Sequence, residues 1–127
     1  MKTLKEEVKF DCSADELWAI LSDVGRCDLV PTIEKIELED DLRHFEMTGM
    51  GKITEKILKQ DHTSMTLQYS AIQTPAPIEH HLSTMEVAPL NYQECRLRWT
   101  TEISPDIFAD DIHQGMLVSI EGIKTVI

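Results

Sequence analysis

From residue 33 to residue 103 the chain alternates between apolar and polar side chains with a period of two, and only short breaks interrupt the pattern. The alternation predicts strands at 33–40, 42–48, 51–60, 64–73, 78–88 and 93–103. The breaks, such as "TGM" and "TPAP", are rich in residues that form turns. Because parallel neighbours need long crossover connections, breaks this short predict an antiparallel meander.

Further elements flank this meander on both sides. A strand is expected at 2–10, and Ser13 with Glu16 three residues later forms a capping box that begins a helix, which Gly25 ends. After Pro105 one apolar stripe recurs at helical spacing, through Phe108, Ile112, Met116, Ile120 and Ile123. This order predicts an α+β fold in which a curved antiparallel sheet of seven strands is wrapped around a long C-terminal helix.

Length and charge narrow the classes of function. The 127 residues predict one domain over 1–127. A net charge of −11 repels phosphate backbones and anionic lipid headgroups, so neither nucleic acid nor membrane insertion is expected. No apolar run approaches the roughly 20 residues that a membrane span needs. Without a secretory signal, the widely spaced Cys12, Cys27 and Cys95 favour packed thiols in a reducing, cytoplasmic location.

The register of the strands brings opposite charges together on the inward face. Opposed residues must share parity if the inward faces are to stay together. A three-residue loop at 48–50 satisfies this condition and places Arg43 opposite Glu55. A loop of the same length at 61–63 places Tyr69 beside Glu55. The sequence therefore predicts an inward-facing Arg43–Glu55 pair with a tyrosine hydroxyl nearby.

Several other polar residues share this inward face, including His81 and Ser83. A dry core tolerates such groups only when all of them are paired. Two interpretations stay open: a structural ion pair near the rim of the sheet, or a mostly apolar cavity whose few polar groups orient a guest. We favour the cavity. The residues expected to line it are Arg43, Phe45, Glu55, Leu67, Tyr69, His81, Ser83, Met85, Leu97, Trp99, Phe108, Ile112 and Met116.

The chain resembles the START-like superfamily, which includes the major birch-pollen allergens, the polyketide cyclase and dehydrase proteins, and the plant abscisic-acid receptors. The matching stretches are "SADELWAILSDV" in the first helix, "LRHFEMTGMGKITEKIL" in the central hairpin and "APIEHHLSTMEVAP" in the strands that follow. "CRLRWTTEISP" and the closing "EGIKTVI" complete the match. The similarity covers essentially the whole chain in the same order.

The resemblance implies a helix-grip fold with a hydrophobic cavity between the sheet and the C-terminal helix. Glu55 matches a pocket glutamate of the hormone receptors, and Ser83 and His81 fall where those receptors have a pocket serine and tyrosine. The histidine is a departure, as is Leu29, where many relatives have tryptophan. The "IQTPAP" segment lacks the receptors' gate signature, so a hormone receptor is not expected.

Other kinds of chemistry find little support in the sequence. His80 and His81 are consecutive on a strand and point to opposite faces, and no metal-ligand spacing is present, so no metal site is expected. There is no GxSxG motif and no glycine-rich phosphate loop. Nucleophilic catalysis and nucleotide binding are therefore not expected, and no cofactor is predicted.

Three functions remain open. The first is binding of a small hydrophobic molecule, such as a lipid, polyketide or isoprenoid, in the internal cavity. The second is an enzyme of the cyclase, aromatase or dehydratase type, in which Glu55 or His81 would act as general acid or base. The third is a protein-interaction domain of the co-chaperone kind, which resemblance to the superfamily also allows.

Overall fold

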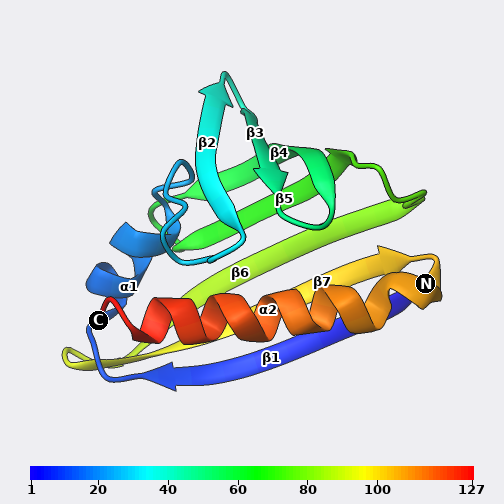
Figure 1. Cartoon of the computed structure of the whole chain (residues 1–127). Helices are drawn as coiled ribbons and strands as arrows, with labels where there is room; N and C mark the ends of the chain where they lie inside the picture. The colour runs from blue at the N-terminus through cyan, green and yellow to red at the C-terminus, as the bar shows by residue number, and fades with distance from the viewer.

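The computed structural model describes residues 1–127 and contains all seven predicted strands and both predicted helices (Figure 1). The elements are β1 Lys2–Phe10, α1 Ala14–Leu21, β2 Ile33–Glu39, β3 Leu42–Met47, β4 Gly51–Asp61, β5 Thr66–Gln73, β6 His80–Asn91, β7 Glu94–Ser104 and α2 Ala109–Lys124. A short 3-10 helix, η1, covers Asp106–Phe108. The first helix begins as predicted, because the Ser13 side chain accepts a hydrogen bond from the Glu16 amide, but it ends at Leu21 rather than at Gly25.

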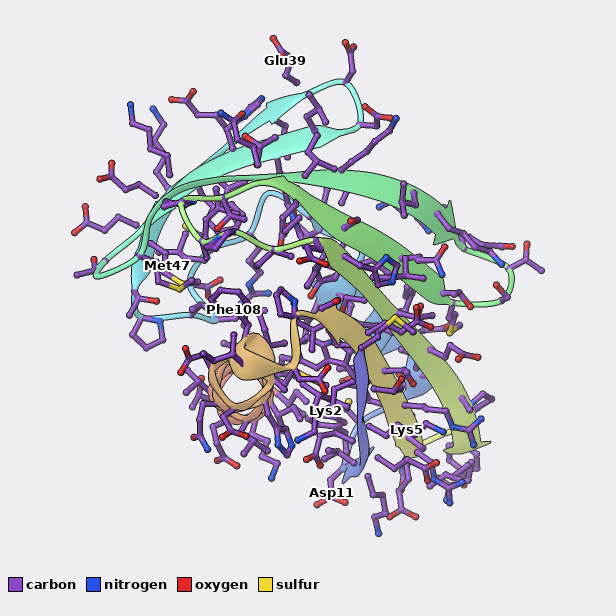
Figure 2. All side chains as sticks on the ribbon, turned by 90° about the vertical axis from the view of Figure 1, so that its right-hand side faces the viewer. Lys2, Lys5, Asp11, Glu39, Met47 and Phe108 are labelled. Atoms are coloured by element: carbon purple, nitrogen blue, oxygen red, sulfur yellow. The ribbon has the colours of Figure 1, made fainter.

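The strands form one antiparallel sheet in the order β1-β7-β6-β5-β4-β3-β2. Every connection from β2 to β7 joins neighbouring strands, which is the predicted meander. Figure 1 shows α2 running along β1, β7 and β6, while the β2–β5 half of the sheet curves away from that side. Figure 2 looks along α2 and shows the sheet bending around the helix. The expected α+β fold, a curved seven-stranded sheet around a C-terminal helix, is confirmed.

The hydrophobic core lies at the α1 end of this arrangement. It joins α1 to β1, β6, β7 and the second half of α2, with Leu17, Leu97 and Cys95 fully buried. Leu97 was expected in the cavity wall but belongs to this core, because it lies two residues closer to the α1 end of β7 than Trp99 does. Burial raises the pKa of both core thiols, that of Cys95 to about 12, so they stay protonated.

The predicted register is confirmed for one hairpin and wrong for the next. Arg43 pairs with Glu55 across β3 and β4 as expected. Tyr69, however, pairs with Ile57, and Glu55 pairs with Ala71. The connecting turn is longer than predicted, since Asp61 pairs with Thr66, and β4 contains a bulge at Leu58. The bulge shifts the pairing by one residue while keeping Tyr69 on the inward face.

An irregular segment, residues 22–32, connects α1 to β2 and packs against α2. At Gly122 of α2, a Cβ atom would lie 1.9 Å from the backbone oxygen of Leu29. Only glycine permits helix and segment to approach this closely. The segment is also tied to the sheet, because Arg43 Nη1 donates to the Val24 carbonyl at 3.4 Å.

Candidate functional site

A cavity of about 360 Å³ lies between the inward face of the sheet, α2 and the 22–32 segment. Of its 33 lining residues 21 are hydrophobic, so the wall is mostly apolar with a small number of polar groups. This is the composition typical of a small-molecule site. A larger groove of about 1150 Å³ runs over the outer face of β2–β4, but it is lined mainly by polar residues. The internal cavity is therefore the candidate site.

Most of the residues predicted for the cavity wall do lie there. The cavity contacts Arg43, Phe45, Glu55, Leu67, Tyr69, His81, Ser83, Met85, Trp99, Ile112 and Met116. Leu97 and Phe108 do not line it. Phe108 belongs to η1, and the tighter 3-10 turn takes it out of phase with the apolar stripe that Ile112 and Met116 continue along α2.

Sequence reasoning missed one entire side of the cavity. The 22–32 segment contributes Asp23, Arg26, Cys27, Leu29, Val30 and Thr32. The apolar residues of this segment follow neither a helical nor a strand periodicity. Because the predicted cavity faces were assigned from that periodicity, no side chain of this segment could be assigned to the cavity. The adjacent apolar residues Leu29 and Val30 in this connection were the available signal.

The Arg43–Glu55 pair lies at the edge of the cavity in a well-shielded position. Arg43 Nε donates to Glu55 Oε1 at 2.7 Å, and each side chain is 14% exposed. The guanidinium carbon of Arg43 also lies 4.5 Å from the centre of the Tyr69 ring, a cation–π contact. Both charges are thus compensated inside the protein. The other carboxylate oxygen, Oε2, has no hydrogen-bond partner.

A second polar group is centred on Ser83. Trp99 Nε1 donates to Ser83 Oγ at 2.7 Å, and Ser83 Oγ lies 3.1 Å from Thr101 Oγ1. Burial of the hydroxyl, followed by the negative charge of Glu55, raises the pKa of Tyr69 to about 12. Tyr69 therefore carries a neutral hydroxyl at physiological pH.

His81 has a hydrogen bond that defines its tautomer. The Ala71 backbone N–H donates to His81 Nδ1 at 2.9 Å, so the neutral ring carries its proton on Nε2. His80, the preceding residue, points outward and contacts Glu102 at 3.0 Å, as the predicted alternation requires. Burial lowers the pKa of His81; Glu55 opposes the shift, and His80 and Arg43 add to it.

The lowered pKa of His81 predicts a specific loss of stability in acid. Below about pH 6.5 the unfolded chain binds a proton at His81 that the folded protein resists. The contribution of His81 is therefore complete above the unfolded pKa and is lost as the pH falls towards the folded pKa. Denaturant unfolding between pH 7 and 5 should show a steeper loss in the wild type than in His81→Asn, by up to about 1.4 kcal/mol per pH unit. Equal slopes would contradict this assignment.

The remaining histidines lie apart from the cavity. His44 contacts Thr54, His62 accepts from Trp18 Nε1, and His113 contacts Glu6. Nowhere do three His, Cys, Asp or Glu side chains gather in a way that could hold a metal ion. No helix is both long and apolar enough to cross a bilayer.

The family follows from a match over most of the chain. The family model described as "Polyketide cyclase / dehydrase and lipid transport" matches residues 1–120. The chain belongs to this family. No curated protein is similar enough in sequence to match.

Solved structures agree with this assignment at the level of the fold. XoxI from Bacillus cereus is 17% identical with a TM-score of 0.89, covering 99% of this chain and 95% of that one. Norcoclaurine synthase from Thalictrum flavum, solved with dopamine and hydroxybenzaldehyde, is 19% identical with a TM-score of 0.79, covering 98% and 85%. The di-domain ARO/CYC protein BexL is 13% identical with a TM-score of 0.83, covering 98% of this chain and 46% of that one. Identities this low establish a shared fold and leave the ligand open.

Proposed function

We propose that the protein binds a small hydrophobic molecule, of the lipid, polyketide or isoprenoid kind, in the cavity beneath α2. The observation that supports this most is the cavity itself: about 360 Å³, walled mainly by apolar side chains, with a few polar groups close to one another. Met47, Met85 and Met116 line it, and flexible methionines can repack around guests of different shapes.

Ligand-dependent stability tests this function. A guest that binds only the folded state at a concentration 100 times its Kd should stabilise the protein by about 2.7 kcal/mol. For a chain of this length that corresponds to a rise in melting temperature of about 10 °C. Native mass spectrometry of protein purified under mild conditions should show added mass, and a panel of neutral apolar compounds should raise the melting temperature in a saturable manner.

A matched pair of variants separates internal binding from surface adsorption. Ala71 lines the cavity, so Ala71→Phe should fill the space and abolish the stabilisation. Ala88 lies exposed on β6, so Ala88→Phe adds the same ring outside and should leave it unchanged. Stabilisation that persists in Ala71→Phe would contradict binding in the cavity.

An enzyme of the cyclase, aromatase or dehydratase type is the second candidate. Two observations favour it: the similar folds include proteins named as a synthase and as an ARO/CYC, and Glu55 has one carboxylate oxygen without a partner beside the cavity. Glu55 is the better base of the two candidates, because His81 Nδ1 already accepts from Ala71. For an enzyme, Glu55→Gln should lower turnover by orders of magnitude, whereas for a carrier it should alter affinity alone.

The protein-interaction alternative has weaker support. That function requires an exposed apolar patch over a closed interior, and the interior here is hollow. The absence of any stabilising small molecule from a broad panel, with no added mass on the purified protein, would favour it over both ligand-based functions.

A further inference from the structure

We propose that the cavity selects uncharged guests carrying a hydrogen-bond acceptor, such as a ketone oxygen, and that His81 supplies the donor through its Nε2–H. This inference rests on the proposed function of binding a hydrophobic molecule. It adds what that function leaves open, namely the charge of the guest and the polar atom that the protein recognises.

His81 has a fixed tautomer. A neutral imidazole has one donor and one acceptor nitrogen, and a neighbour decides which is which. The Ala71 N–H at 2.9 Å occupies Nδ1 as an acceptor, so Nε2 carries the hydrogen. The lowered pKa of His81 supports the neutral form near pH 7. His81 therefore offers the cavity a donor and no acceptor.

The Nε2 atom of His81 has no partner within the protein. This atom makes no hydrogen bond with the protein, yet no fully buried polar side-chain atom lacks a partner. Nε2 must therefore retain accessible surface, although the whole residue is only 8% exposed. The cavity is the space that the ring lines. A guest that places no acceptor there would leave a shielded donor unpaired, which is unfavourable.

The Arg43 guanidinium and the Ser83 hydroxyl already have partners within the protein. Arg43 donates to Glu55 and to the Val24 carbonyl, and Ser83 accepts from Trp99 and contacts Thr101. These hydrogen bonds form with no guest present. His81 Nε2–H differs because it is a donor without a partner in the protein, whereas the unpaired Glu55 Oε2 can only accept a hydrogen bond.

The charged side chains around the cavity disfavour anionic guests. Only two cationic side chains line the cavity, and each is paired: Arg43 with Glu55 at 2.7 Å, and Arg26 with Asp28 at 2.5 Å. Asp23 and Asp111 also line it, within a chain of net charge −11. A carboxylate or phosphate guest would find no free cation and would lose its hydration, so anions are disfavoured.

Three rigid probes of nearly the same shape test the proposal: fluorene, fluorenone and fluorene-9-carboxylate. Their affinities are measured by thermal shift and calorimetry on the wild type and on His81→Asn. Asparagine keeps an amide oxygen near the position of Nδ1, where it can accept from Ala71, but places no donor at the position of Nε2. The fluorenone-to-fluorene affinity ratio should fall about tenfold in His81→Asn. In the wild type the carboxylate should bind at least about tenfold more weakly than fluorenone.

The tautomer of His81 and its response to a guest can also be measured in the wild-type protein. Long-range ¹H–¹⁵N spectra report the tautomer of each histidine ring, and His81 should show a protonated Nε2 and an unprotonated Nδ1. Fluorenone should shift the Nε2–H resonance more than fluorene does. This readout stays decisive even if His81→Asn fails to fold.

The outcomes separate the inference from the function on which it rests. If neither neutral probe binds, the hydrophobic-cavity function and the inference are both overturned. If both bind and the affinity ratio is the same in His81→Asn, or if the tautomer is reversed, only the role of His81 is overturned. If the carboxylate binds as tightly as the ketone, the selection against charge is overturned.

Discussion

Replacing Gly122 with alanine should destabilise the protein by about 2–3 kcal/mol, although alanine is the better helix former. The added methyl group would lie 1.9 Å from the Leu29 carbonyl oxygen. Backbone cannot rotate away as the end of a side chain can, so α2 and the 22–32 segment would have to separate. Overpacking typically costs about 1–3 kcal/mol and occasionally more, and a backbone contact this short belongs at about 3–4 kcal/mol; after the gain of about 1 kcal/mol in helix propensity, about 2–3 kcal/mol remains. Thermal unfolding should show a fall of roughly 7–11 °C.

Gly115 on the same helix provides the control. Nothing lies within 4 Å of a Cβ added there, so Gly115→Ala should keep the propensity gain and stabilise by up to about 1 kcal/mol. The two variants make the same chemical change and should act in opposite directions. Stabilisation by both would mean that α2 does not pack on the 22–32 segment as described.

Replacing Arg43 with methionine should cost about 2–4 kcal/mol of unfolding free energy at neutral pH. The change leaves the Glu55 carboxylate shielded and without its cation, and removing one partner of a buried pair costs about 3–5 kcal/mol. We expect a slightly smaller value because both side chains are 14% exposed. Chemical denaturation monitored by tryptophan fluorescence would measure it, since Trp18 and Trp99 are both buried.

Arg98 and Glu7 form the matched control, since Arg98 Nε contacts Glu7 Oε1 at 3.1 Å on the exposed face. Arg98→Met should cost less than about 1 kcal/mol, because exposed ion pairs contribute little. In the double variant Arg43→Met/Glu55→Leu, most of the lost stability should return, since two apolar side chains can replace a buried pair at little cost. If Arg43→Met and Arg98→Met behaved alike, the pair would not be shielded.

The features of the fold that depend on the two-residue periodicity of the strands and on the parity of paired residues were predicted from the sequence. The alternation identified every strand of the meander, and parity together with a three-residue loop at 48–50 placed Arg43 opposite Glu55. The same argument failed one hairpin later, because the turn between Asp61 and Thr66 is longer than predicted and the bulge at Leu58 adds a residue to β4 only. Together the two changes keep Tyr69 on the inward face but give it Ile57 as its partner, and they place Gln60 opposite Leu67.

The parts of the site that lie outside helices and strands could not be predicted from periodicity. The 22–32 segment is held in place by its close approach to Gly122 and by the hydrogen bond from Arg43 to the Val24 carbonyl. Gly122 and Arg43 lie outside the segment in sequence, and a backbone carbonyl gives no side-chain signal. The tautomer of His81 likewise depends on a backbone amide of the neighbouring strand. Such features follow from the packed tertiary structure, so the residue types could be predicted here but not their hydrogen-bonding states.

The bond between Ala71 and His81 has one more consequence. Backbone pairing of β5 with β6 stops at Tyr69 opposite Ser83. Beyond that point two hydrogen bonds that involve side chains join the strands: the Ala71 N–H donates to the His81 ring, and Ser70 Oγ donates to the His81 carbonyl. A strand pair joined by side-chain hydrogen bonds opens at a lower free energy than one joined by a continuous ladder of backbone hydrogen bonds. Amide hydrogen exchange should therefore be faster at Ala71 than at Leu67. The β5–β6 connection should open locally while the rest of the protein stays folded.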